Sequence, residues 1–92
     1  MKLFAVAVTA TADTGNACPV GEEHSLMVLI WAASIEPTID LAQRALAQHR
    51  WIDARLDGDV QAVIVSADQI GDATTRRAAH AAMEQGAAII VY

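Results

Sequence analysis

The run SLMVLIWAAS, from Ser25 to Ser34, constrains the fold more than any other feature of the sequence, because apolar side chains occupy both its odd and its even positions. A β-strand directs alternate side chains to opposite faces of its sheet, so a strand with this composition is hydrophobic on both faces. The run is too short for an isolated buried helix, and it is rich in residues that favour strands. The sequence therefore predicts a strand that is covered on both sides.

Two further segments have strand character. Leu3–Val8 (LFAVAV) alternates larger and smaller apolar residues with the period of a strand. Together with Ala10-x-Ala12 this region also resembles a secretory signal, but its apolar core is short for one, and we interpret it as a strand. Ala87–Tyr92 is wholly apolar and is predicted to form another strand.

Two segments between these strands have helical periodicity. In the first, IEPTIDLAQRALAQHR, Ser34 or Glu36 is the predicted N-cap and Pro37 lies in the first turn, where its missing N–H costs nothing. In the second, Asp72 is the predicted N-cap and Gly86 the residue that ends the helix. The apolar stripes are predicted to contain Ile35, Ile39, Leu41, Ala42, Ala45 and Leu46 in the first helix and Thr75, Ala78, Ala79, Ala82 and Met83 in the second.

The segment WIDARLDGDVQAVIVSA, between the two helices, contains the turn signal Asp57-Gly58. A three-residue loop here places Leu56 opposite Val60 and gives one apolar face, so we expect Trp51–Leu56 and Val60–Val65 to form a hairpin. Val60–Val65 and Ala87–Val91, joined by one helix, are then expected to form a right-handed parallel βαβ unit.

The predicted order of elements is β-β-α-β-β-α-β in a single α+β domain, residues 1–92. Residues 25–92 resemble the split βαβ, or ferredoxin-like, plan, in which two helices cover one face of an antiparallel or mixed sheet, with residues 1–10 as an extra N-terminal strand. The alternative is a small three-layer α/β domain in which Trp51–Leu56 is not a strand. In the ferredoxin-like plan the second face of the sheet stays apolar and exposed, which predicts a homodimer through that sheet face.

The charge of the chain bears on its partners. Six Lys and Arg residues against eleven Asp and Glu residues give a net charge of −5, and the cations are scattered among acids. Nucleic acid and anionic membranes are therefore not expected as partners. No apolar run has the length of a transmembrane helix. The single cysteine cannot form an internal disulfide, which fits a cytoplasmic location.

The segment TADTGNACPVGEEH, Thr11–His24, holds the cysteine and one of three histidines, and is interpreted as a strand connection that a partner subunit holds in place. Cys18, His24 and Trp31 are the candidates for ligand binding. No catalytic residue is assigned, because the acids around Cys18 oppose formation of a thiolate. No metal or cofactor is predicted, because neither paired zinc ligands nor a phosphate-binding glycine motif occurs.

The function favoured by these observations is a small, dimeric, non-enzymatic module that binds a small molecule or a protein partner. One alternative is a small enzyme of the dimeric ferredoxin-like kind, with a pocket between sheet and helices. Another is a structural or antitoxin-like interaction subunit. A pocket of at least about 300 Å³ with converging polar groups would favour ligand binding or catalysis over a purely structural role.

Overall fold

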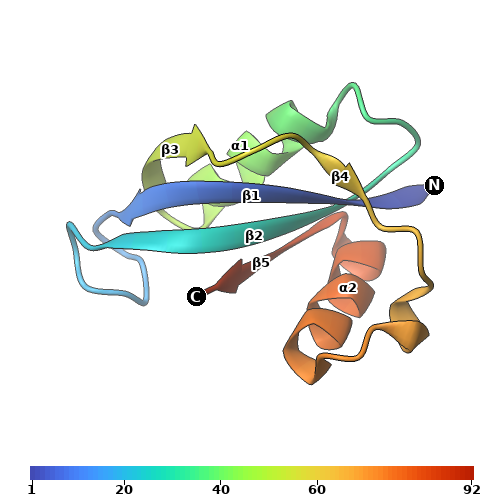
Figure 1. Cartoon of the computed structure of the whole chain (residues 1–92). Helices are drawn as coiled ribbons and strands as arrows, with labels where there is room; N and C mark the ends of the chain where they lie inside the picture. The colour runs from blue at the N-terminus through green and yellow to red at the C-terminus, as the bar shows by residue number, and fades with distance from the viewer.

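The computed structural model describes every residue from Met1 to Tyr92 and contains one sheet, two α-helices and a short 3-10 turn (Figure 1). Neither α-helix is long and apolar enough to cross a lipid bilayer. In chain order the elements are β1 (Lys2–Ala12), β2 (Glu23–Ala32), α1 (Thr38–Gln48), β3 (Trp51–Leu56), β4 (Gln61–Ala62), η1 (Ala67–Gln69), α2 (Ala73–Gln85) and β5 (Ala87–Val91).

The centre of the sheet is the long hairpin of β1 and β2. The two strands pair in antiparallel register over their whole length, from Lys2 opposite Ala32 to Thr11 opposite Glu23. β3 and β5 flank this hairpin, which gives the order β3-β1-β2-β5, and every pairing is antiparallel. The predicted α+β class is thus confirmed as an antiparallel sheet of five strands with two helices.

The predicted hairpin between Trp51–Leu56 and Val60–Val65 is wrong. Both segments pair with β1 along the same edge, with Leu56 opposite Val8 and Ala62 opposite Phe4. β1 is long enough to accept both segments in line, and pairing with it places them against the buried hairpin instead of against each other. The Asp57-Gly58 turn signal therefore marks an interruption in an edge strand.

The predicted parallel unit of Val60–Val65 and Ala87–Val91 is also wrong. β4 pairs with β1 and β5 pairs with β2, so the central hairpin separates the two segments. The strand order is consequently not the ferredoxin-like order expected for residues 25–92. The β1–β2 hairpin occupies the middle of the sheet, which corrects the prediction that β1 is an extra strand added to the sheet.

The two helices cover opposite faces of the sheet, which corrects the expectation that both lie on one face. The even-numbered residues of β1 and β2 pack against α1, and the odd-numbered residues pack against α2. The chain thus buries both apolar faces of its hairpin with its own helices, in three layers (Figure 1). The α1-side core includes Phe4, Val6, Val8, Leu26, Val28, Ile30, Ala42 and Leu46, and the α2-side core consists of Leu3, Leu29, Ala79, Ala82 and Ile90.

The first turn of α1 differs from the prediction. The helix begins at Thr38 after Pro37, with no side chain capping it, so neither Ser34 nor Glu36 is its N-cap. Thr38 is fully buried, and its hydroxyl donates a hydrogen bond to the Ile35 carbonyl oxygen at 2.7 Å, so this buried polar group has a partner. A hydrogen bond with Ser34 is instead the main cause that lowers the pKa of Glu36.

The ends of α2 agree with the prediction. Asp72 Oδ2 accepts hydrogen bonds from the Thr75 N–H at 2.8 Å and from the Thr75 hydroxyl at 2.7 Å. Gly86 follows the helix with a φ of 94°, a left-handed conformation that favours glycine. This tight ending directs the chain from α2 straight into β5, which starts at Ala87.

We predict that the cap at Asp72 makes stability depend on pH. The hydrogen bonds from Thr75 lower the pKa of Asp72 in the folded protein, so its stabilisation is present above the unfolded pKa and is lost as pH falls through the folded one. Asp72→Ala should lower the melting temperature at neutral pH, and the difference from wild type should shrink at about pH 3. Asp59→Ala, at an exposed position without a side-chain hydrogen bond, is the control, and an equal loss there would contradict the assignment.

Candidate ligand-binding groove

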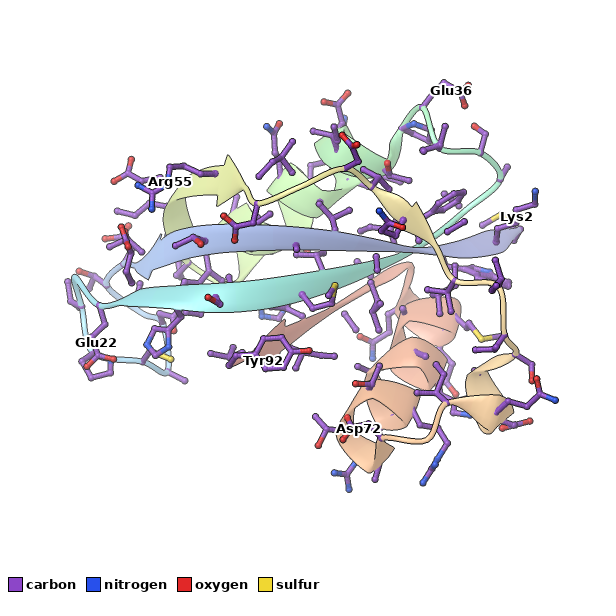
Figure 2. All side chains as sticks on the ribbon, in the orientation of Figure 1. Lys2, Glu22, Glu36, Arg55, Asp72 and Tyr92 are labelled. Carbon is purple, nitrogen blue, oxygen red and sulfur yellow. The ribbon has the colours of Figure 1, made fainter.

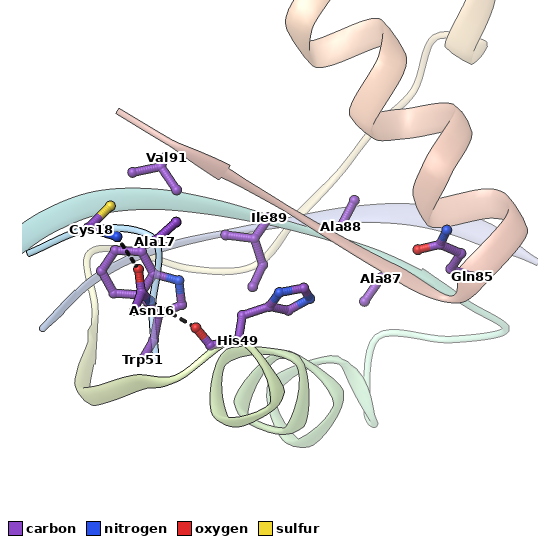
Figure 3. Close-up of a pocket in the computed structure, with 10 residues that line it drawn as sticks. All are labelled: Asn16, Ala17, Cys18, His49, Trp51, Gln85, Ala87, Ala88, Ile89 and Val91. Atoms are coloured by element: carbon purple, nitrogen blue, oxygen red, sulfur yellow. Dashed lines mark hydrogen bonds between the residues drawn. The ribbon is translucent and has the colours of Figure 1, made fainter. Parts of the chain in front are cut away.

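A pocket of about 330 Å³ lies on the α1 side of the sheet along β5, and we call it the β5 groove (Figure 3). Its walls come from three parts of the chain: the β1–β2 loop, the junction between α1 and β3, and the α2–β5 segment. The residues that line it are Asn16, Ala17, Cys18, His49, Trp51, Gln85, Ala87, Ala88, Ile89 and Val91.

The floor of the groove is the α1-facing side of β5. The register with β2 places Ala87, Ile89 and Val91 on the same face as Ile30, Val28 and Leu26, respectively. The β2 residues are buried, whereas Ala87 and Ile89 are only partly buried and Val91 is 45% exposed. An apolar strand surface is therefore left open beside the covered core.

The inner wall is the junction of α1 and β3. α1 ends at Gln48, and only His49 and Arg50 separate it from Trp51, the first residue of β3. Arg50 has a φ of 62°, so the chain turns sharply here and brings the His49 side chain and the Trp51 ring to the same pocket. Trp51 is almost fully buried, and the His24 ring packs edge-on against it with 5.7 Å between the ring centroids.

The β1–β2 loop is fastened to this junction by Asn16. Its Nδ2 donates to the His49 carbonyl at 2.8 Å and to the Arg50 carbonyl at 3.2 Å, while its Oδ1 accepts from the Cys18 N–H at 2.8 Å. The Asp13 N–H also donates to the Arg50 carbonyl, at 2.9 Å. The loop expected to depend on a partner subunit is thus held by its own chain.

Cys18 lines the groove and is partly buried against the α1-side core. Its Sγ makes no hydrogen bond with His24 or with His49, although the Cys18 N–H is held by Asn16. A nucleophilic thiol requires a base or a cation in contact with it. Cys18 therefore forms part of the pocket wall, and no base or cation contacts its thiol to activate it as a nucleophile.

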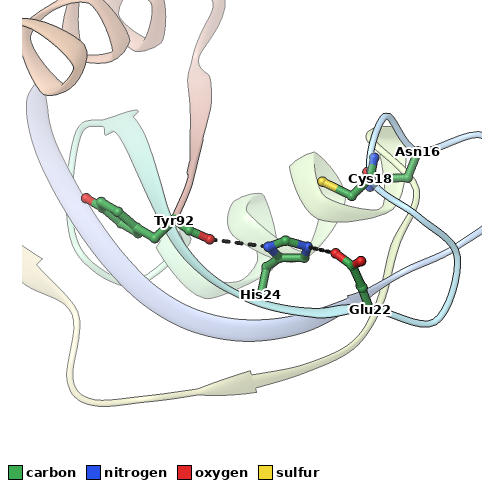
Figure 4. Close-up of polar contacts among 5 residues, drawn as sticks. All are labelled: Asn16, Cys18, Glu22, His24 and Tyr92. Carbon is green, nitrogen blue, oxygen red and sulfur yellow. Dashed lines mark hydrogen bonds and ion pairs between the residues drawn. The ribbon is translucent and has the colours of Figure 1, made fainter.

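His24 connects the loop to the end of β5 (Figure 4). Its Nε2 lies 2.8 Å from Glu22 Oε1, and its Nδ1 lies 3.2 Å from the Tyr92 carbonyl oxygen. Both partner atoms are hydrogen-bond acceptors, so the neutral ring can donate to one of them and the protonated ring to both. His24 also packs in a T-shaped arrangement against Trp51 and is not among the residues that line the groove.

Trp31 lies away from the other two candidates. It lies seven positions from His24 along β2, which corresponds to about 23 Å of strand, and its odd position belongs to the α2 side. In Figure 2 the labelled Lys2 and Glu22 mark the corresponding two ends of the hairpin. Trp31 instead borders a second hollow of about 370 Å³, together with Met1, Lys2, Leu3, the 63–67 segment and Met83. Cys18, His24 and Trp31 thus do not form one site.

Sequence reasoning did not select His49, Trp51 and Gln85, which also line the β5 groove. The sequence signal that could have pointed to His49 and Trp51 is their closeness at the end of a predicted helix. Only the turn at Arg50, however, shows that both side chains reach one pocket. No group of three or more His, Cys, Asp or Glu side chains is arranged to hold a metal ion.

We predict that Asn16 sets the stability of the loop. Asn16→Ala removes three hydrogen bonds and should lower the free energy of unfolding by about 1–2 kcal/mol in urea denaturation. Thr14→Ala, in the same loop, removes no side-chain hydrogen bond and serves as the control. Equal stability of the two variants would show that the loop is held by other contacts.

The β5 groove combines an apolar floor and an aromatic wall with hydrogen-bonding groups at its rim. No Asp, Glu, Lys or Arg lines it, so the arrangement suits an uncharged molecule with an apolar body. Comparison of the chain with protein-family models, with curated proteins and with solved structures found no match.

Proposed function

We propose that this protein is a non-enzymatic binding module that takes a small, uncharged, largely apolar molecule in the β5 groove. The observation that carries the proposal is the meeting of an open apolar strand face, Trp51 and two unengaged polar side chains in one pocket. The volume, about 330 Å³, is at the lower end of the range for small-molecule sites, so the ligand is small.

The two polar side chains that orient the ligand are His49 and Gln85. Neither side chain makes a hydrogen bond within the protein, in contrast to Asn16, whose amide is fully used by the loop. His49 lies at the end of α1 and Gln85 at the end of α2, so they offer hydrogen bonds from separate elements. A ligand with polar groups on an apolar ring would engage both while its ring rests on Ile89 and Trp51.

An enzyme remains the second candidate, because the groove contains a thiol and an imidazole, those of Cys18 and His49. Binding is favoured over catalysis because the thiol makes no hydrogen bond to either nearby histidine. The second hollow, beside Trp31, is less favoured as the binding site, since its lining is mainly apolar and its polar groups, those of Lys2 and Ser66, are few.

We predict that benzimidazole, a small aromatic probe with hydrogen-bonding nitrogens, binds the β5 groove. In amide-resolved NMR titrations, the resonances of Asn16–Cys18, His49 and residues 87–91 should shift, while those of residues 63–67 beside Trp31 should not. Shifts confined to residues 63–67, or no shift at millimolar probe, would contradict the proposal.

We also predict that filling the groove weakens this binding. Ala87→Phe places a ring over the floor of the groove and should raise the dissociation constant for benzimidazole at least about tenfold in the same titration. Ala54→Phe makes the same change at an exposed position on β3, outside the groove, and should leave the dissociation constant unchanged. Equal effects of the two substitutions would place the probe elsewhere.

A further inference from the structure

The outer edge of β5 is an unpaired strand edge. β5 pairs with β2 alone, and the Trp31 N–H donates to the Gly86 carbonyl while the Tyr92 N–H donates to the Ser25 carbonyl. Residues 86, 88, 90 and 92 therefore direct their backbone groups toward β2. By alternation, the backbone N–H and C=O groups of Ala87, Ile89 and Val91 point outward, away from the sheet.

The two edges of the sheet differ in how they are protected. The β3–β4 edge is interrupted between Leu56 and Gln61, carries Asp53 with a φ of 54°, and has the charged side chains of Arg55 and Asp57. Interruptions, kinks and charges of this kind prevent strand addition. β5, with the sequence AAIIV, has no charge, no proline and no bulge. An edge of that composition is a template for another strand.

We propose that two copies of this chain pair through their β5 edges in antiparallel orientation, with the two-fold axis at Ile89. This register uses all three outward residues of each copy, because Ile89 meets its own counterpart and Ala87 meets the partner's Val91. Each of the three would then donate one backbone hydrogen bond and accept one. The result is a continuous sheet that runs through both protomers.

A second copy fits this edge better than a different partner, because the pairing closes. Once two β5 edges have joined, the remaining edges of the dimer are the interrupted β3–β4 edges, so growth stops at two chains. An axis perpendicular to the sheet keeps both α2 helices on one face and makes them antiparallel.

The α2 surface next to the edge also permits this approach. Thr74, Ala78, Ala81 and Gln85 share one side of α2 by helical spacing, and Gln85 lines the groove beside β5. This side carries no charge, and its two central residues are alanines. A neighbouring protomer therefore meets neither a buried charge nor a large side chain here.

Edge pairing differs from the sheet-face dimer predicted from the sequence. That prediction assumed that one whole face of the sheet lacks a helix, whereas α2 packs on that face through Ala79 and Ala82. No element of the same chain closes the outward side of the β5 groove. If the proposed function is correct, edge pairing would complete this side of the ligand site with the partner subunit's β5.

The test is the oligomeric state of the full chain by sedimentation equilibrium. Wild type should sediment at twice 9.7 kDa at low micromolar concentration. Val91→Pro removes an outward N–H without breaking a bond to β2 and should raise the dimer dissociation constant at least about a hundredfold. Val91→Lys, at the same exposed position, should act in the same direction by adding a charge to the edge, and circular dichroism verifies that each variant folds.

Ile64→Lys is the matched control, because Ile64 is 94% exposed and lies on the segment between β4 and η1. It should remain dimeric. A monomeric wild type, or a dimer that neither Val91 variant weakens, would overturn edge pairing. Since benzimidazole binding is measured separately by NMR, a dimer that does not bind the probe would refute the proposed ligand class and leave the edge pairing intact.

A disulfide provides a second, independent measurement. Antiparallel pairing at the axis places the two Cα atoms of residue 89 about 5.5 Å apart, within the range for a disulfide. In a Cys18→Ser background, Ile89→Cys should form a covalent dimer under mild oxidation, whereas Ile64→Cys should not. Equal cross-linking of the two variants would indicate random collision and would count against the register.

Discussion

The structure depends on burying both faces of the β1–β2 hairpin. Val6 and Val28 on one face are fully buried, and Leu29 on the other face is 2% exposed. Each such side chain contributes roughly 1.5–3 kcal/mol when it is removed from water, so neither face can be left open without a large loss. With one helix on each face, the single chain satisfies both faces, and a partner is not needed for that purpose.

The same arrangement creates the groove. α1 covers the α1-side core over β1 and β2 but leaves β5 partly open, because the helix ends at Gln48 and the chain returns at once to β3 on the far edge. The short turn at Arg50 brings Trp51 under the loop, and Asn16 fastens the loop to the same turn. Two walls of the groove, the β1–β2 loop and the α1–β3 junction, therefore follow from how α1 ends, whereas the third follows from the ending of α2 at Gly86.

The two edges of the sheet differ in whether they can accept another strand: the β3–β4 edge is protected, and the β5 edge is not. On the β3–β4 edge, the Asp57 carboxylate accepts a hydrogen bond from the Thr9 hydroxyl, and the Asp57 N–H donates to the Ala7 carbonyl. These polar groups are therefore not free to pair with another strand. On β5 the outward groups have no such partners, and the side chains beside them are apolar. Association and ligand binding are both proposed at the same strand because it is the one apolar strand that the helices leave incompletely covered.

Local sequence pattern is sufficient to predict part of this structure. The two-sided apolar strand at Ser25–Ser34 and the helix ends at Asp72 and Gly86 follow from periodicity and from the conformational preferences of single residues. Cys18 was predicted as a candidate for ligand binding; it lies in the wall of the groove, and its binding role stays a prediction.

Tertiary structure alone decided which strands pair, which face each helix covers, and which side chains share a pocket. The Asp57-Gly58 signal is compatible with a hairpin or with an interrupted edge strand, and the choice depends on the free edge of β1, about fifty residues earlier in the chain. The grouping of Cys18, His49 and Gln85 likewise requires three separate elements to meet. Such contacts depend on the burial gained by the whole chain, which no local pattern records.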